Sequence, residues 1–329
     1  MTPPRTTHSD APSLGSGLGW MLLAALGFAA VSTLTSLAVS ERVSLFTVLT
    51  WRYTLSAVVL VMWVGTRRYP KVAWKEAMRL IVLGGGGQAL FVGLALSSLQ
   101  FITAATLGFL FFTFPAWMTL VQLLRGAEEL SARRAIALVG VCGGVGVIVL
   151  QLANSGTRDL SPFAGSGTAH GIALALGAAA VYGLYIPLMQ WMQKSHPMAV
   201  TSAYANIGAA LCFLMLTVGE RSLTLSISGR AWGAILALAL FCTVLPRLFF
   251  LKGLGRLGPV RAGLVSAVEP LLTVLLGAVV LAQPLTPSVM GGGVMIVAAV
   301  VSHRARGVSP RVSRSLADPG YGDAGAWPD

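Results

Sequence analysis

Ten long apolar runs restrict what this chain of 329 residues can fold into. Each run is 18 to 23 residues long, close to the roughly 20 apolar residues that an α-helix needs to cross a bilayer. In hydrocarbon every backbone N–H and C=O must bond internally, which only helices and closed barrels achieve. The sequence therefore predicts an all-α integral membrane protein with ten transmembrane helices, at residues 18–39, 45–64, 80–99, 102–124, 135–152, 169–191, 199–218, 231–251, 260–281 and 285–302.

The composition agrees with a membrane protein. Charged residues make up only 10% of the chain, whereas soluble domains carry about 25%. The net charge of +12 is concentrated in short basic clusters between the apolar runs, which indicates membrane orientation and not nucleic-acid binding. Three cysteines lie inside apolar runs, without the spacing of a disulfide framework or a metal site: Cys142, Cys212 and Cys242. We therefore expect no cofactor and no metal.

The basic residues also predict an orientation. With both termini in the cytoplasm, seventeen Lys and Arg residues lie in inside segments and four lie outside, namely Arg42, Arg158, Arg221 and Arg230. Cytoplasmic loops carry this excess of positive charge in membrane proteins, and an even number of spans returns the chain to the same side. We predict a multi-pass protein of the cell inner (plasma) membrane with both termini cytoplasmic.

The two halves of the sequence are related by one offset of 155 residues. This offset superposes Leu96 on Leu251, Leu99 on Leu254, Gly108 on Gly263, Pro115 on Pro270 and Leu130 on Leu285. The prolines carry most weight, because a proline within a helix removes a backbone hydrogen bond and must be accommodated. Five spans per half is an odd number, so the halves enter the membrane from opposite sides, as in many transporters.

This repeat divides the chain into five parts. They are a cytoplasmic N-terminal tail (1–16), a first repeat with helices one to five (17–152), an external linker (153–168), a second repeat with helices six to ten (169–303) and a cytoplasmic tail (304–329). The last part is rich in Gly, Pro and Asp, so we expect it to be disordered.

Motifs in both halves resemble a known family. The first half has Thr103-Ala104-Ala105-Thr106, Pro115, Glu129-Leu130 and the glycines from Gly140 to Gly146. The second has Leu254-Gly255-Arg256-Leu257-Gly258-Pro259-Val260-Arg261-Ala262 followed by Glu269-Pro270. Together they are similar to the two EamA-type repeats of the drug/metabolite transporter superfamily, over about residues 17 to 303.

The resemblance implies a ten-helix exporter or exchanger of small metabolites. Its central cavity would lie between helices one to four and six to nine, with helices five and ten as supporting elements. One position departs from the family: a Gly-Glu pair usually ends helix nine, and this chain has Ala282-Gln283. If that glutamate stabilises a helix end, the change is mild; if it is functional, coupling at that end is altered.

Glu269 is the first candidate for a functional side chain. It lies about nine residues into helix nine, roughly 13 Å from its cytoplasmic end, and ionisable groups within spans usually face a cavity or a partner. Its repeat mate is Phe114, so the fold itself does not require a carboxylate there. We interpret Glu269 as a proton-binding or amine-binding group, with a buried ion pair to Arg247 as the alternative.

Two arginines lie within predicted spans. Arg247 is about four residues from the predicted cytoplasmic end of helix eight, so its long side chain could reach the interface instead of a site. Arg52 is about seven residues into helix two and could bind an anionic substrate group or clamp a carbonyl; the structural role is favoured.

Further polar or amphipathic groups at mid-span could recognise a substrate, although each one alone is more typical of helix packing. They are Gln88, Tyr182, Tyr185, Asn206 and Trp117. Pro115 and Pro270 are expected to break helices four and nine. Glycines at 84–87, 140, 144 and 291–293 are expected to allow close helix packing. The aromatic run of Phe109, Phe111, Phe112 and Phe114 covers several faces of helix four, and we do not interpret it as a stacking motif.

The predicted function is secondary active transport of small metabolites by alternating access, most plausibly export of amino acids or related compounds. The expected partners are membrane lipid, a small-molecule substrate and protons as a candidate coupling ion, with monomer and homodimer both open. A flippase for lipids or lipid carriers is the alternative and would require a lateral opening. An intramembrane enzyme is disfavoured, because no span contains an aspartate and the four histidines lie in tails or at helix ends.

Overall fold

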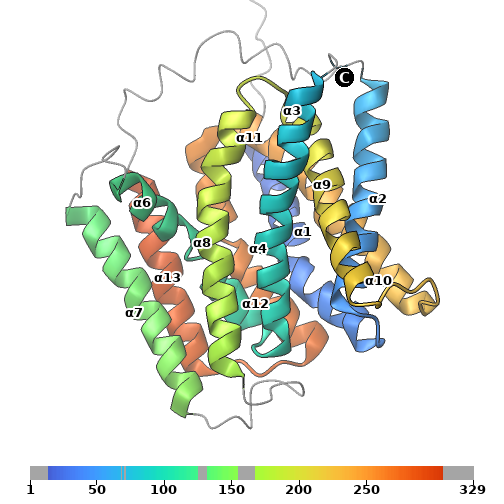
Figure 1. Cartoon of the computed structure of the whole chain (residues 1–329). Coiled ribbons are helices and arrows are strands. Elements are labelled where there is room, and N and C mark those ends of the chain that lie inside the picture. Colours follow the sequence, from blue (N-terminus) through green and yellow to red (C-terminus); the bar gives the residue numbers. More distant parts are fainter. Residues whose placement is uncertain (1–13, 68, 70–71, 125–131, 155–166, 307–329) are drawn as a thin grey trace, which may run out of the picture.

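The computed structural model describes residues 14–67, 69, 72–124, 132–154 and 167–306. Helices are the only regular elements in these ranges (Figure 1). The first half contains α1 (Leu14–Ser40), α2 (Leu45–Thr66), α3 (Trp74–Arg79), η1 (Leu80–Gly85), α4 (Gly86–Ser97), η2 (Ser98–Gln100), α5 (Ala104–Phe111), α6 (Phe114–Leu124) and α7 (Ala132–Asn154). The second contains α8 (Thr168–Met192), α9 (Met198–Gly219), α10 (Gly229–Ala239), η3 (Leu240–Val244), α11 (Leu245–Ser266), α12 (Glu269–Leu281) and α13 (Pro287–Arg306).

Seven helical segments of the described chain are long and apolar enough to cross a membrane. They run from 15 to 40, 45 to 66, 74 to 100, 104 to 124, 168 to 192, 198 to 219 and 229 to 258. Three shorter apolar helices, at 138–150, 269–281 and 289–299, coincide with the remaining predicted spans. The prediction of an all-helical membrane protein is therefore confirmed, while the count of ten crossings stays a prediction.

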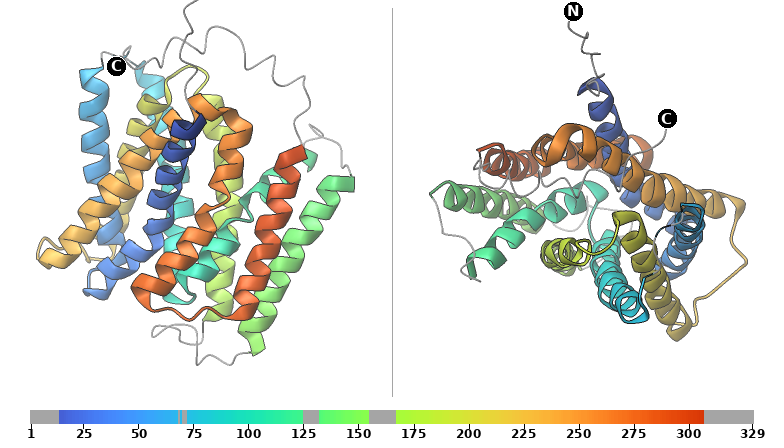
Figure 2. Two further views of the ribbon diagram at one scale, coloured as in Figure 1. Left: turned by 180° about the vertical axis from the view of Figure 1, so that it is seen from behind. Right: turned by 90° about the horizontal axis from the view of Figure 1, so that it is seen from above.

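The two halves pack across one another in matching pairs. Helix α1 packs against α10, α11 and α12, and its counterpart α8 packs against η1, α4, α5 and α6. The other pairs are α2 with α9 and α7 with α13. Helices α1 and α8 run in opposite directions (Figures 1 and 2). We call the end of the bundle where α1 begins the near end, at the top of Figure 1, and the other the far end.

The fourth span of each half is broken at the same place. Helix α5 ends at Phe111 and α6 begins at Phe114, while α11 ends at Ser266 and α12 begins at Glu269. The two-residue breaks are related by the offset of 155, and Pro115 or Pro270 is the second residue of the helix that follows each break. Proline is tolerated in the first turn of a helix but not in its interior, so both prolines begin a new half-helix.

The third span of each half contains a π-helical turn, η1 in the first half and η3 in the second. Such turns insert a residue into the helix and are frequent at functional sites. Gln88 follows the end of η1 by three residues, and Arg247 follows the end of η3 by three. The two polar side chains therefore lie equally far after the inserted turns, although the offset of 155 pairs Gln88 with Thr243.

Glycines let the halves approach closely at two places. Gly85 of η1 lies against the backbone of Gly208 in α9, with no room for a Cβ atom between them. A Cβ at Gly144 of α7 would lie 2.6 Å from the carbonyl oxygen of Gly292 in α13. Small residues thus bring these helices into backbone contact, as is common within membranes.

Candidate functional site

A polar group centred on Tyr185 joins both halves of the protein. The Tyr185 hydroxyl of α8 donates a long hydrogen bond, 3.4 Å, to Oε1 of Gln88 in α4. Arg247 of α11, Tyr182 of α8 and Tyr53 of α2 lie close enough to interact electrostatically with that hydroxyl. Of the predicted candidates, Gln88, Tyr182, Tyr185 and Arg247 therefore come together, from three separate spans.

Aromatic rings surround the same tyrosines. Tyr182 lies 4.7 Å from Phe91, 5.1 Å from Phe111 and 4.9 Å from Phe114, measured between ring centroids. Phe91 also contacts Tyr185 at 5.2 Å. All five side chains are partly exposed. We call these rings together with Gln88 and Arg247 the Tyr185 site.

The sequence interpretation of the phenylalanine run was wrong for two of its members. Phe111 and Phe114 flank the break between α5 and α6, and both rings pack on Tyr182. The break turns the chain, so residues that would cover different faces of a continuous helix reach one cluster. Phe91 and Tyr53 were also missed, because single aromatic residues in apolar runs carry no distinguishing signal.

Gly87 explains why Tyr185 can reach α4. A Cβ atom at Gly87 would lie 2.8 Å from the Tyr185 ring, so the ring packs directly on the glycine backbone. Together with the contact of Gly85 to Gly208, this makes the glycine tract part of the architecture of the site.

Arg247 is deeper than the sequence suggested. Span eight does not end near Leu251 but continues to Gly258, where φ is 73° and ψ is 167°. Only glycine adopts that conformation readily, so the chain reverses there. Arg247 lies ten residues before Leu257, about 15 Å along the helix, and it is partly buried near Tyr185. The longer span therefore disfavours the snorkelling interpretation.

Arg52 holds the π-turn in place. Its side chain is 4% exposed, and Nε donates to the Thr243 hydroxyl at 2.9 Å. Thr243 in turn donates to the carbonyl of Leu238 at 2.8 Å. These bonds tie α2 to the distorted turn that precedes Arg247. One Arg52 nitrogen, Nη1, is buried without a hydrogen-bond partner.

Glu269 lies apart from the arginines. It is the first residue of α12, it is partly buried, and among the described residues no side chain forms an ion pair or hydrogen bond with its carboxylate. The alternative of a buried pair with Arg247 is therefore wrong. A carboxylate within a span without such a partner is costly, by roughly 2.5 kcal/mol or more on insertion scales.

Two other candidates lie outside the Tyr185 site. Asn206 is fully buried in α9, where Nδ2 donates to the Ser202 carbonyl at 2.7 Å and Oδ1 has no partner. Trp117 of α6 is 36% exposed, and its Cβ borders Gly183 at the contact with α8. Both residues lie at contacts between helices, and a role in substrate recognition stays a prediction for each.

At the far end the two broken spans meet and pack together. Helix α5 packs against α12, with Gly108 against Thr273 and Gly277 against Ala104. Oε1 of Gln283 accepts a hydrogen bond from the backbone N–H of Ala104 at 3.0 Å. The hydroxyl oxygen of Thr103 accepts one from the backbone N–H of Thr106 at 3.2 Å. Gln283 thus satisfies an unpaired donor at the start of α5, a helix of the other half.

The residue before Gln283 has an unusual backbone. Ala282 has φ 51° and ψ 32°, the left-handed conformation that often ends helices and that glycine adopts most easily. The Gly-Glu pair that the family resemblance implies at this place would suit both needs, a left-handed turn and an acceptor for the helix end. The departure to Ala282-Gln283 keeps the acceptor and strains the turn.

The near end is arranged differently. In the described part of the chain, no comparable packing joins α6 to α11, the pair equivalent to α5 and α12. The halves still touch at this end through His196 and Glu76, whose Nε2 and Oε2 atoms lie 2.8 Å apart. The two ends of the broken spans therefore differ in contact although the backbone is repeated.

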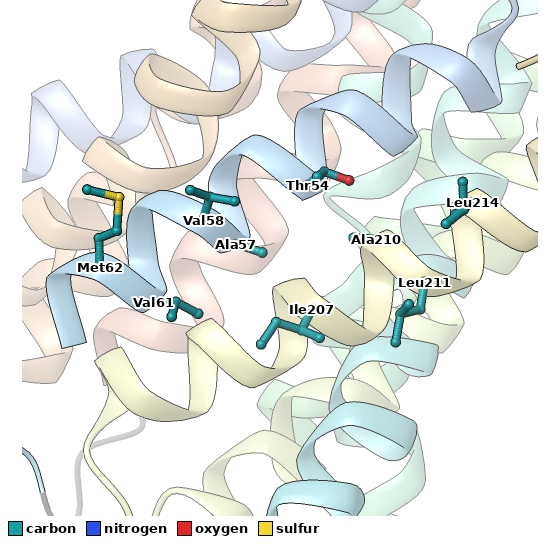
Figure 3. A pocket seen from close by; sticks show the side chains of 9 residues that line it. All are labelled: Thr54, Ala57, Val58, Val61, Met62, Ile207, Ala210, Leu211 and Leu214. Carbon is teal, nitrogen blue, oxygen red and sulfur yellow. The ribbon is translucent and has the colours of Figure 1, made fainter. Parts of the chain in front are cut away.

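A groove between α2 and α9 is a separate feature (Figure 3). Apart from Thr54, its lining is apolar, and several of the side chains are exposed on the surface: Val58, Val61, Met62, Leu211 and Leu214. None of the residues of the Tyr185 site lines it. Its chemistry fits acyl chains of the surrounding bilayer.

These features define a polytopic membrane transporter built from two repeats. The EamA-like transporter family matches residues 15–150 and 169–302, so the chain belongs to that family. A Bacillus subtilis (strain 168) protein named "Uncharacterized transporter YetK" is 26% identical over 269 residues, covering 80% of this chain and 79% of that protein. A solved crystal structure with TM-score 0.60 and 18% identity covers 87% of this chain and 97% of its own, and supports the fold.

Proposed function

We propose that this transporter is a secondary carrier that exports amino acids or related small metabolites by alternating access. In this proposal ten helices, as two inverted five-helix repeats, cross the plasma membrane, and both termini are cytoplasmic. The near end is then the cytoplasmic end, and the far end is external. The basic-residue distribution supports this orientation.

One observation carries the proposal: the equivalent broken-span contacts differ at the two ends. Helices α5 and α12 pack together, whereas no comparable packing joins α6 and α11 within the described residues. Since the two pairs are related by the repeat, exchanging their roles would open the far end and close the near end. Transporters with inverted repeats use such an exchange around a fixed site near mid-membrane. The Tyr185 site lies between the halves, where such a site is expected.

Glu269 is the proposed coupling group. It begins the half-helix α12, which packs against α1 and against α5 of the other repeat. A proton or the amine of a substrate would neutralise the carboxylate and offset the cost of placing it within a span. Its position at a break lets small shifts of α12 change the access of solvent to the carboxylate.

Exchange in liposomes tests the carrier proposal. Purified protein is reconstituted in liposomes that contain a mixture of unlabelled amino acids, and uptake of the labelled mixture is compared with that in empty proteoliposomes. The binding site of a carrier returns to the outer face faster when it carries substrate, so internal substrate should accelerate uptake. Protein-free liposomes provide the background. Equal rates with and without internal substrate would contradict a carrier of these compounds.

A flippase for lipids or lipid carriers is the second candidate. The observation in its favour is the apolar groove between α2 and α9, which opens on the surface between the two repeats. Fluorescent-lipid flipping in the same proteoliposomes would distinguish the two functions. Lipid movement without amino-acid exchange would favour the flippase.

A further inference from the structure

Arg247 is a charged group for which the described part of the chain supplies no counter-charge. Within the described residues its guanidinium has no ion pair and no hydrogen bond, and the Tyr185 site contains no carboxylate. Glu269 does not pair with it, and the Glu76 carboxylate pairs with His196 instead. An unpaired cation in this setting is costly, and such residues mark sites where a ligand or ion supplies the missing charge.

A second donor of the Tyr185 site is also unused. Gln88 is 1% exposed, and while its Oε1 atom accepts from Tyr185, its Nε2 atom is buried without a partner. Leaving a buried N–H donor unpaired costs about 1 to 3 kcal/mol. The Arg247 guanidinium and the Gln88 Nε2 atom are both hydrogen-bond donors, so both need acceptor oxygens. A carboxylate offers two such oxygens together with a negative charge.

The rings beside these donors set the shape of the rest of the ligand. Phe91, Phe111, Phe114 and Tyr182 form a partly exposed cluster with centroid separations between 4.7 and 6.3 Å. Aromatic ligands gain from offset or edge contacts with such rings. A cationic ligand, which rings alone would also attract, would be repelled by Arg247.

We propose that the Tyr185 site selects carboxylates that carry an aromatic ring, with Arg247 and Gln88 binding the carboxylate and the ring cluster binding the body. This inference rests on the proposed function, since it names the substrate class of the same site. Arg52 is a positioning residue, because its bond to Thr243 holds the π-turn before Arg247.

Equilibrium binding to the full-length protein in lipid nanodiscs tests the selectivity. The probes are phenylacetate, its neutral analogue phenylacetamide, the cation phenethylamine and acetate, which lacks the ring. Phenylacetate should bind at least about tenfold more tightly than each of the others, the factor that corresponds to 1.4 kcal/mol. Equal affinity for phenylacetate and phenylacetamide, or preference for phenethylamine, would overturn the proposal.

Variants separate the two parts of the site. Arg247→Gln should remove the preference for phenylacetate over phenylacetamide, while Arg261→Gln, an exposed arginine of the same helix, should keep it. Tyr182→Leu should lower the affinity for phenylacetate and for phenylacetamide by the same factor. If Arg247→Gln does not fold, the wild-type preference still decides the question.

The binding test and the transport test fail independently. Selective phenylacetate binding without accelerated exchange in liposomes would support the substrate class and contradict the carrier function. Accelerated exchange of amino acids, together with no selective binding of phenylacetate, would support the carrier and overturn the substrate class.

Discussion

The two broken spans have the same backbone and different chemistry. In the first repeat, Phe114 begins α6 and packs on Tyr182 beside Phe111. In the second, Glu269 begins α12 at the equivalent position, and it contributes no ring contact to the Tyr185 site. The repeat therefore sets where a half-helix starts, whereas the individual side chain sets what that position can bind.

The same comparison holds for the two ends of these spans. The far-end pair, α5 and α12, is packed and linked by Gln283, and the near-end pair is not. A symmetric scaffold in one asymmetric state is what a carrier with inverted repeats requires. The following experiments test whether the halves are opposed, whether their breaks differ in role and how strongly the far end is held.

The largest expected effect is all-or-none labelling of equivalent loops. Ser40 and Ser195 are related by the repeat offset of 155, and both are exposed. In a cysteine-free background, Ser40→Cys should react with an impermeant thiol reagent added to intact cells, and Ser195→Cys should react only after permeabilisation. Labelling of both from outside would disprove the opposed orientation of the halves.

The next effect separates the two breaks. Glu269→Gln keeps the size and removes the charge, so we expect uptake in proteoliposomes to lose its response to an imposed pH gradient. Phe114→Leu should keep that response and raise the half-saturation concentration about fivefold, because an aromatic contact contributes about 1 kcal/mol. An unchanged pH response in Glu269→Gln would reduce Glu269 to a structural residue.

A smaller effect concerns the packed helices at the far end. Gln283→Ala removes the acceptor for the Ala104 N–H, and losing such a helix cap costs about 1 kcal/mol. We expect a lower midpoint of thermal unfolding in detergent. Gln283→Glu should not lower it, since a carboxylate accepts the same bond and favours a helix N-terminus. Equal stability of all three proteins would show that this bond does not hold α5.

The smallest effect tests the strained turn beside it. Ala282→Gly should raise the same unfolding midpoint, because the left-handed conformation at φ 51° costs a non-glycine residue about 1 kcal/mol. Ala278→Gly, in the regular part of α12, provides the control and should lower the midpoint by a similar amount. If both substitutions destabilise equally, the conformation of Ala282 is not strained.

The sequence by itself determined the apolar spans, the repeat and the places of Pro115 and Pro270. These properties depend on hydropathy, chain length and proline geometry, which are local and visible along the chain. It also identified Gln88, Tyr182, Tyr185 and Arg247 as separate polar groups within spans. Their assembly into one site was not visible.

Only the tertiary structure decided which side chains meet. The Tyr185 site draws residues from α4, α5, α6, α8 and α11, so its formation depends on how each helix is rotated about its axis. A π-turn adds one residue and shifts that rotation by about 100°, as in the spans of Gln88 and Arg247. The conformation of Gly258 sets the end of span eight. Gln283 bonds to Ala104 in the other half, more than 170 residues away in the chain. Such contacts arise from packing between distant segments, and local sequence periodicity carries no record of them.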